Sequence, residues 1–142
     1  MTGVPGVRAL DHTADVGIEI EAPDLPEACR RAVRGTAWLL LERTPSEDRT
    51  ERNVRVEEAD PARLLRALLR ELLWWHDSEG LVPVDLRGVS AVREGDRPSL
   101  EATVVLSRER EPPVREIKGV TLHGLVLEPR GEGWYGKVIF DV

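Results

Sequence analysis

The stretch that decides the fold is Asp11-His12-Thr13-Ala14-Asp15-Val16-Gly17-Ile18-Glu19-Ile20, close to the start of the 142-residue chain. Its second half alternates apolar and polar residues, which predicts a half-buried strand with Val16, Ile18 and Ile20 facing inward. Its first half places two carboxylates and an imidazole where that strand begins. Because aspartate is common in turns, spacing alone favours a turn-forming role for both acids.

The natural partner of this strand is the far end of the chain, Lys137-Val138-Ile139-Phe140-Asp141-Val142. Apolar residues occupy both of its faces, which predicts a central, buried strand. If the two strands pair, Asp15 and Asp141 meet across the sheet. Two nearby carboxylates repel each other, and a hard cation relieves that repulsion. The functional interpretation is therefore a cation site between Asp15 and Asp141. The alternative is that Asp11 and Asp15 only shape a turn.

Composition predicts a single soluble globular domain, residues 1–142, with residues 1–6 as a flexible lead-in. Charged residues make up 32% of the chain and hydrophobic residues 41%, with a net charge of −6 that argues against a broad phosphate-binding surface. The single cysteine, Cys29, allows no internal disulfide and favours a cytoplasmic location. We expect no membrane partner, because no signal peptide and no sufficiently long apolar stretch are found.

Two amphipathic helices are predicted. Asp24-Leu25-Pro26-Glu27 has the form of a helix start, with Asp24 as the N-cap and Glu27 as its capping-box partner, and helical spacing of apolar residues continues to Leu41. Cys29 falls on the buried stripe of this helix, where it fills space. Asp60-Pro61 begins the second helix, which ends at Asp77–Gly80.

Trp74-Trp75-His76-Asp77 lies near the end of the second helix and invites a binding role. A structural role is favoured, because aromatic side chains commonly cover a sheet edge while keeping a polar group at the rim.

The remaining sequence reads as strands. They are expected at 50–57 as a charged edge strand, at 81–92 with a bend at Gly88, at 100–106, at 117–127 and at 134–142, the last two joined by a hairpin turn at 130–133. The order β-α-β-α-β-β-β-β predicts the α+β class, with two helices packed on a mostly antiparallel sheet.

Neither a nucleophile elbow, a phosphate-cradling glycine loop, a zincin helix nor a zinc-ligand spacing is found. Polar residues inside strands remain to be explained. Lys118 can simply extend to solvent, and His123 can be a satisfied core histidine. Five polar residues lie on strands that could be neighbours in the sheet, and they are the candidate site residues: His12, Asp15, Lys118, His123 and Asp141.

Three blocks of the sequence resemble the signature blocks of the archease family. They are Asp11-His12-Thr13-Ala14-Asp15-Val16-Gly17, Ile117-Lys118-Gly119-Val120-Thr121-Leu122-His123 and Val138-Ile139-Phe140-Asp141-Val142. The first is the most specific, and with the leucine-rich second helix the resemblance covers nearly the whole chain. The chain departs from the family pattern at Gly119 and Leu122, where alanine and tyrosine are usual.

The resemblance implies an accessory protein that is not itself an enzyme. Its partner would be the RNA ligase that joins 2′,3′-cyclic phosphate or 3′-phosphate ends to 5′-hydroxyl ends in tRNA splicing and RNA repair. The accessory protein would promote GTP-dependent guanylylation of the ligase histidine and so allow multiple turnover. Contact with tRNA would be indirect, through the ligase.

The resemblance also implies site residues. A divalent ion, calcium first and magnesium or manganese as alternatives, would bind Asp15 and Asp141, with Val142 as a further ligand. Lys118 matches the functional lysine, and His12 and His123 are further candidates for ligase activation.

Two other functions remain open from the sequence. One is a metal-dependent hydrolase, with Asp15 and Asp141 holding the ion and His12 or His123 as the base. The other is a general chaperone or modulator of RNA-modifying proteins that uses exposed apolar surface around Trp74 and Trp75.

Overall fold

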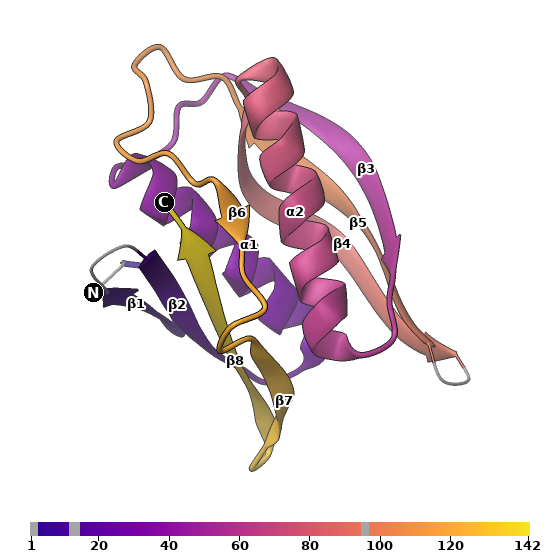
Figure 1. Ribbon diagram of the computed structural model, residues 1–142. Coiled ribbons are helices and arrows are strands. Elements are labelled where there is room, and N and C mark those ends of the chain that lie inside the picture. Colours follow the sequence, from indigo (N-terminus) through magenta and orange to yellow (C-terminus); the bar gives the residue numbers. More distant parts are fainter. Residues whose placement is uncertain (1–2, 12–14, 95–96) are drawn as a thin grey trace.

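The computed structural model describes residues 3–11, 15–94 and 97–142. Within these residues it has two helices and eight strands (Figure 1). They are β1 (Val7–Asp11), β2 (Asp15–Ala22), α1 (Leu25–Leu41), β3 (Arg49–Glu57), α2 (Pro61–Glu79), β4 (Val82–Glu94), β5 (Arg97–Ser107), β6 (Gly119–Val120), β7 (Val126–Arg130) and β8 (Gly133–Asp141).

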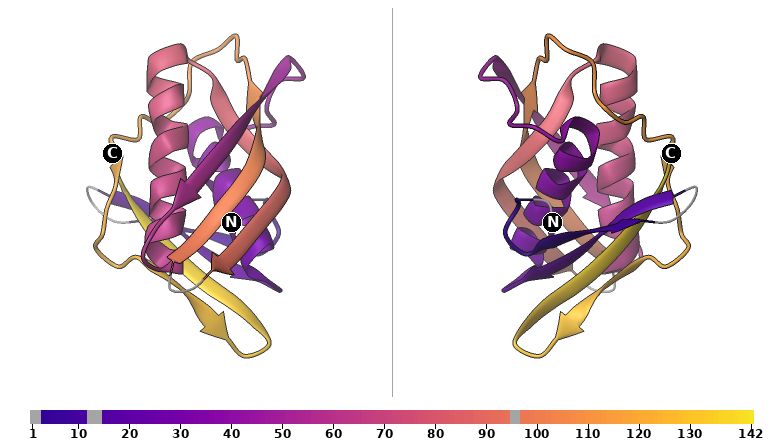
Figure 2. Two further views of the ribbon diagram at one scale, coloured as in Figure 1. Left: turned by 90° about the vertical axis from the view of Figure 1, so that its right-hand side faces the viewer. Right: turned by 90° about the vertical axis from the view of Figure 1, so that its left-hand side faces the viewer.

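The α+β class is confirmed, and the strands form two antiparallel sheets. Strands β1-β2-β8-β6, with β7 also on β8, make one sheet, and β3-β5-β4 make the other. Both helices contact both sheets, so they lie in a layer between them (Figure 2). Each sheet thereby buries one face against the helices.

The two helices begin where the sequence predicts. Oδ1 of Asp24 accepts the backbone N–H of Glu27 at 2.8 Å, and Oδ1 of Asp60 accepts that of Arg63 at the same distance. These aspartates satisfy N–H groups that have no partner inside the helix. Gly80, with φ of 73°, ends α2 in the left-handed conformation that glycine adopts without strain.

The three-stranded sheet also matches its predictions. β3 pairs only with β5 in the described sheet, so it is an edge strand with alternating charged residues. In β4 the register with β5 shifts between Arg87 and Ser90, and Gly88 has φ of 56°. The predicted bend at Gly88 is therefore a β-bulge.

In the five-stranded sheet, β8 lies between β2 on one side and β6 and β7 on the other, as predicted for a central strand. Phe140 and Val138 are fully buried toward the helices, and Ile139 on the opposite face is only 4% exposed. The edge strand β1 was not predicted. It pairs antiparallel with β2 along its full length.

The predicted long strand 117–127 is wrong. It is divided into β6 and β7, with a turn at residues 122–124 in which Gly124 has φ of 70°. The left-handed conformation of Gly124 turns the chain beside the side chains of Ile139 and Lys137 of β8, and this turn separates the two short strands. The predicted hairpin from β7 to β8 is confirmed, with Arg130 opposite Gly133.

The buried core joins residues from all three layers, and Cys29 lies inside it with no exposed surface. The lead-in predicted for residues 1–6 is partly described: Gly6 accepts the backbone N–H of Glu21 at 2.9 Å, which continues the ladder beyond β1. Among the described residues, neither helix has the length and apolar character needed to cross a bilayer.

Candidate functional site

The candidate site lies at the end of the β2–β8 ladder. Asp15 and Asp141 are directly opposite each other in the antiparallel register, and the next pair along is Val16 and Phe140. Because side chains alternate along a strand, the two acids lie on the face of the sheet turned away from the buried Phe140. Asp15 is half-buried and Asp141 is exposed.

Directly opposed residues in an antiparallel pair have Cβ atoms about 4.5–5.5 Å apart. Oxygen ligands lie about 2.3–2.6 Å from calcium, so one ion can bridge two such carboxylates. In the described part of the chain no arginine or lysine forms an ion pair with Asp15 or Asp141. The pair therefore fits a hard cation in ligand type and placement.

A third carboxylate on the same face is already satisfied. Glu19, four residues along β2 from Asp15, accepts a hydrogen bond from the hydroxyl of Tyr135 at 2.7 Å and pairs with Arg8. The guanidinium of Arg8 and the Tyr135 hydroxyl lower the pKa of the Glu19 carboxyl. Unlike Glu19, Asp15 and Asp141 have no ion-pair partner among the described residues.

The segment before β6 is held against Asp141 by its backbone. The N–H of Lys118 donates to the carbonyl oxygen of Asp141 at 2.7 Å, and Gly119 is the residue opposite Asp141 in the β6–β8 pair. The Lys118 side chain is exposed. Three segments distant in the sequence thus meet at this edge: the start of β2, the end of β8 and the start of β6.

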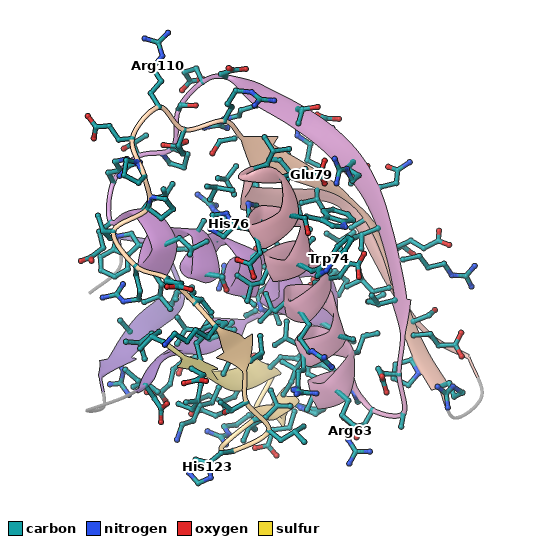
Figure 3. All side chains as sticks on the ribbon, turned by 45° about the horizontal axis from the view of Figure 1, so that its top comes forward. Arg63, Trp74, His76, Glu79, Arg110 and His123 are labelled. Atoms are coloured by element: carbon teal, nitrogen blue, oxygen red, sulfur yellow. The ribbon has the colours of Figure 1, made fainter. Side chains whose placement is uncertain are left out.

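The remaining predicted site residues behave differently. His123 lies in the turn between β6 and β7, and its exposed side chain points away from the body of the protein (Figure 3). The structure does not bring it to the acid pair, because the expected strand ends before it. Val142 follows Asp141 and packs its side chain against the core. His12 lies outside the described residues.

The described residues hold no group of three or more histidine, cysteine or acidic side chains that could bind a metal. Two carboxylates alone leave most of the calcium shell open, since calcium takes about 6–8 oxygens. If an ion binds here, backbone oxygens, water or a partner would have to complete its shell.

The four residues Trp74 to Asp77 divide into two kinds. Trp75 is 7% exposed, donates its indole N–H to Glu71 at 3.0 Å and stacks under Arg52. Nδ1 of His76 donates to the carbonyl oxygen of Leu81 at 2.9 Å, which ties down the end of α2. The favoured structural role is confirmed for these two. Trp74, by contrast, is 63% exposed.

Known proteins resemble this chain over nearly its whole length. The family model described as "Archease protein family (MTH1598/TM1083)" matches residues 8–142. The protein archease of Thermococcus gammatolerans is 34% identical over 135 residues, covering 93% of this chain and 95% of the relative. The probable protein archease of Mycobacterium tuberculosis is 31% identical over 141 residues, covering 96% of this chain and 75% of the relative.

Solved structures agree. The solution structure of protein 1598 from Methanobacterium thermoautotrophicum superimposes with a TM-score of 0.79 at 26% identity, over 96% of this chain and 99% of that one. A crystal structure from Thermotoga maritima, described as an archease and possible chaperone, has the same fold, with a TM-score of 0.62 at 24% identity, over 95% of this chain and 96% of that one. With a family match from residue 8 to residue 142, the chain belongs to the archease family.

Proposed function

We propose that this protein is an accessory factor that activates an RNA ligase of the kind that joins 2′,3′-cyclic phosphate or 3′-phosphate ends to 5′-hydroxyl ends. It promotes guanylylation of the ligase histidine and is not itself the catalyst. The observation that carries the proposal is the register that sets Asp15 opposite Asp141 on the outward face of a family member's sheet.

In this proposal Asp15 and Asp141 hold a divalent cation, calcium first, and a main-chain oxygen of Val142 is a further ligand. The bound cation would supply positive charge to phosphate oxygens. The residues suit the role because two acids cannot fill the shell by themselves, and a partly filled shell leaves positions for a partner's ligands.

Lys118 would place a second positive charge beside the acid pair. Its backbone is fixed by the hydrogen bond to Asp141, while its exposed ammonium is free to approach a phosphate. The net charge of −6 disfavours the protein's own binding to RNA, so RNA reaches it through the ligase.

The test measures guanylylation of the purified ligase in GTP, with and without this protein. We expect Asp15→Asn and Asp141→Asn to abolish activation. Loss of a residue that only supports a metal ligand typically weakens metal binding about 10–100-fold. Each aspartate variant removes a ligand itself, so calcium affinity should fall by at least that factor. Glu128→Gln, an exposed carboxylate on β7, serves as the matched control and should activate normally.

Full activation by both aspartate variants would contradict the metal role. Hydrolysis of phosphoester or RNA substrates without any ligase would instead indicate the metal-dependent hydrolase. Suppression of aggregation of unrelated proteins, unaffected by Asp15→Asn, would indicate the general chaperone.

A further inference from the structure

A groove of about 590 Å³ runs between α2 and the segment at the start of β6. Six residues of α2 line it, among them an outward row at helical spacing, Ala67, Arg70, Trp74 and Asp77, and the opposite wall includes Lys118 and Gly119. Neither the periodicity of α2 nor the three sequence blocks indicates this groove, because its two walls come from distant segments.

The groove carries polar and aromatic groups that the fold does not use. The Trp74 indole is 63% exposed, whereas its neighbour Trp75 is buried with its N–H satisfied. Within the described ranges no carboxylate pairs with Arg70 or Lys118, although eleven other arginines, Arg63 of α2 among them, form ion pairs. Asp77 is likewise without an ion-pair partner there.

This combination suits a protein partner. Tryptophan and arginine are the residues that dominate binding energy at protein interfaces, where they sit in water-excluded pockets. A nucleic acid is disfavoured because Glu71 and Asp77 place two carboxylates in the same groove, which repel phosphates. A matching protein segment would offer an apolar side chain to Trp74 and a carboxylate to Arg70.

The groove lies beside the end of β8 that carries Asp141. Lys118 lines the groove and donates its backbone N–H to Asp141, and Gly119 lines the groove while lying opposite Asp141 in the sheet. A protein that approaches the Asp15–Asp141 edge therefore meets this groove.

We infer that the groove is the docking site for the ligase: a segment of the ligase packs an apolar side chain on Trp74 and pairs a single carboxylate with Arg70. The inference rests on the proposed function. It separates two tasks, since the groove supplies affinity and the acid pair supplies activation.

The experiment measures ligase binding by calorimetry and ligase guanylylation over a range of concentrations of this protein. We expect Trp74→Ala and Arg70→Glu each to raise the Kd by at least about tenfold, as hot-spot residues do. The same variants should reach the wild-type guanylylation rate at saturating concentration. Asp15→Asn should show the opposite pattern, with near-normal binding and no activation.

Two controls accompany these variants. Arg110→Glu reverses an exposed charge on the loop between β5 and β6, where the side chain projects away from the groove (Figure 3), and should bind as wild type. Circular dichroism should show intact α2 in Trp74→Ala, because alanine favours helix at an exposed position.

The outcomes are distinct. If the wild-type protein activates the ligase but Trp74→Ala and Arg70→Glu bind it as tightly, the docking site is wrong and the proposed function stands. If the wild-type protein neither binds nor activates the ligase, both are wrong. If the wild-type protein binds an RNA oligonucleotide and Trp74→Ala does not, the groove is an RNA site and the assignment is wrong. If the wild-type protein self-associates in sedimentation and Trp74→Ala does not, the groove is an interface between two copies and the assignment is likewise wrong.

Discussion

Cys29 shows how burial alone decides the chemistry of a residue. Its side chain has no exposed surface within the core between α1 and the sheets, and burial raises the pKa of the thiol from 9.0 to about 12. The thiolate is the reactive form of cysteine, so this residue is chemically silent at neutral pH. The sequence predicted this role from the position of Cys29 on the apolar stripe of the helix.

We expect Cys29 to resist Ellman's reagent in the native protein at pH 8 and to react at once in denaturant. Reaction in the folded protein needs a thiolate that the reagent can reach. Burial keeps the Cys29 thiol protonated and out of reach of the reagent. Absorbance of the released thiolate gives the rate. Rapid and complete labelling of the folded protein would contradict the buried placement.

At the scale of elements, the pairing of β2 with β8 depends on Gly17. A Cβ added there would lie 2.6 Å from the carbonyl oxygen of Val138 and 2.8 Å from Cδ1 of Ile139. The carbonyl belongs to the central strand and cannot move aside cheaply. Gly17 therefore allows the close approach that sets Asp15 opposite Asp141.

Gly17→Ala should lower the free energy of unfolding by about 1–3 kcal/mol, the usual cost of overpacking. Urea denaturation followed by tryptophan fluorescence measures it. Gly119→Ala is the matched control: nothing lies within 4 Å of its added Cβ, so a change within about 0.5 kcal/mol is expected. Equal effects of the two substitutions would show that strand packing at Gly17 is not the cause.

Across the whole molecule, Glu109 ties together two loops far apart in the sequence. Its carboxylate, 7% exposed, accepts the backbone N–H of Ser46 at 2.8 Å and the hydroxyl of Ser107 at 2.7 Å, and pairs with Arg43. Burial alone would raise the pKa of Glu109, but these donors and the guanidinium together outweigh it and lower the pKa. The bonds connect the chain after α1 to the chain after β5.

A lowered folded-state pKa means that Glu109 stabilises the protein above its unfolded pKa, about 4.3, and that this contribution is lost as pH falls through the folded value. Glu109→Gln should therefore lower the free energy of unfolding by about 1–3 kcal/mol at pH 7. The difference from wild type should shrink in strongly acidic buffer. Denaturation curves at both pH values test this, with exposed Glu111→Gln as the control; a pH-independent difference would contradict the ionic origin.

Much of the fold could be predicted because its signals are local. Asp24 and Asp60 cap helices by bonds within one turn, and Gly88 marks its bulge by its own conformational freedom. The break at Gly124 could not be predicted in the same way. Its surroundings alternate like a strand, and the turn forms where the chain passes over Ile139 and Lys137 of a different strand.

The sequence by itself determined the α+β class, the ends of both helices and the two acids at the ends of β2 and β8, because periodicity and capping act between residues close along the chain. Only the tertiary structure decided that the strands form two sheets around the helices, that His123 turns away, and that Trp74 rather than Trp75 faces the groove beside Lys118. Those outcomes depend on how the helix layer packs, and packing brings together surfaces that no local pattern connects.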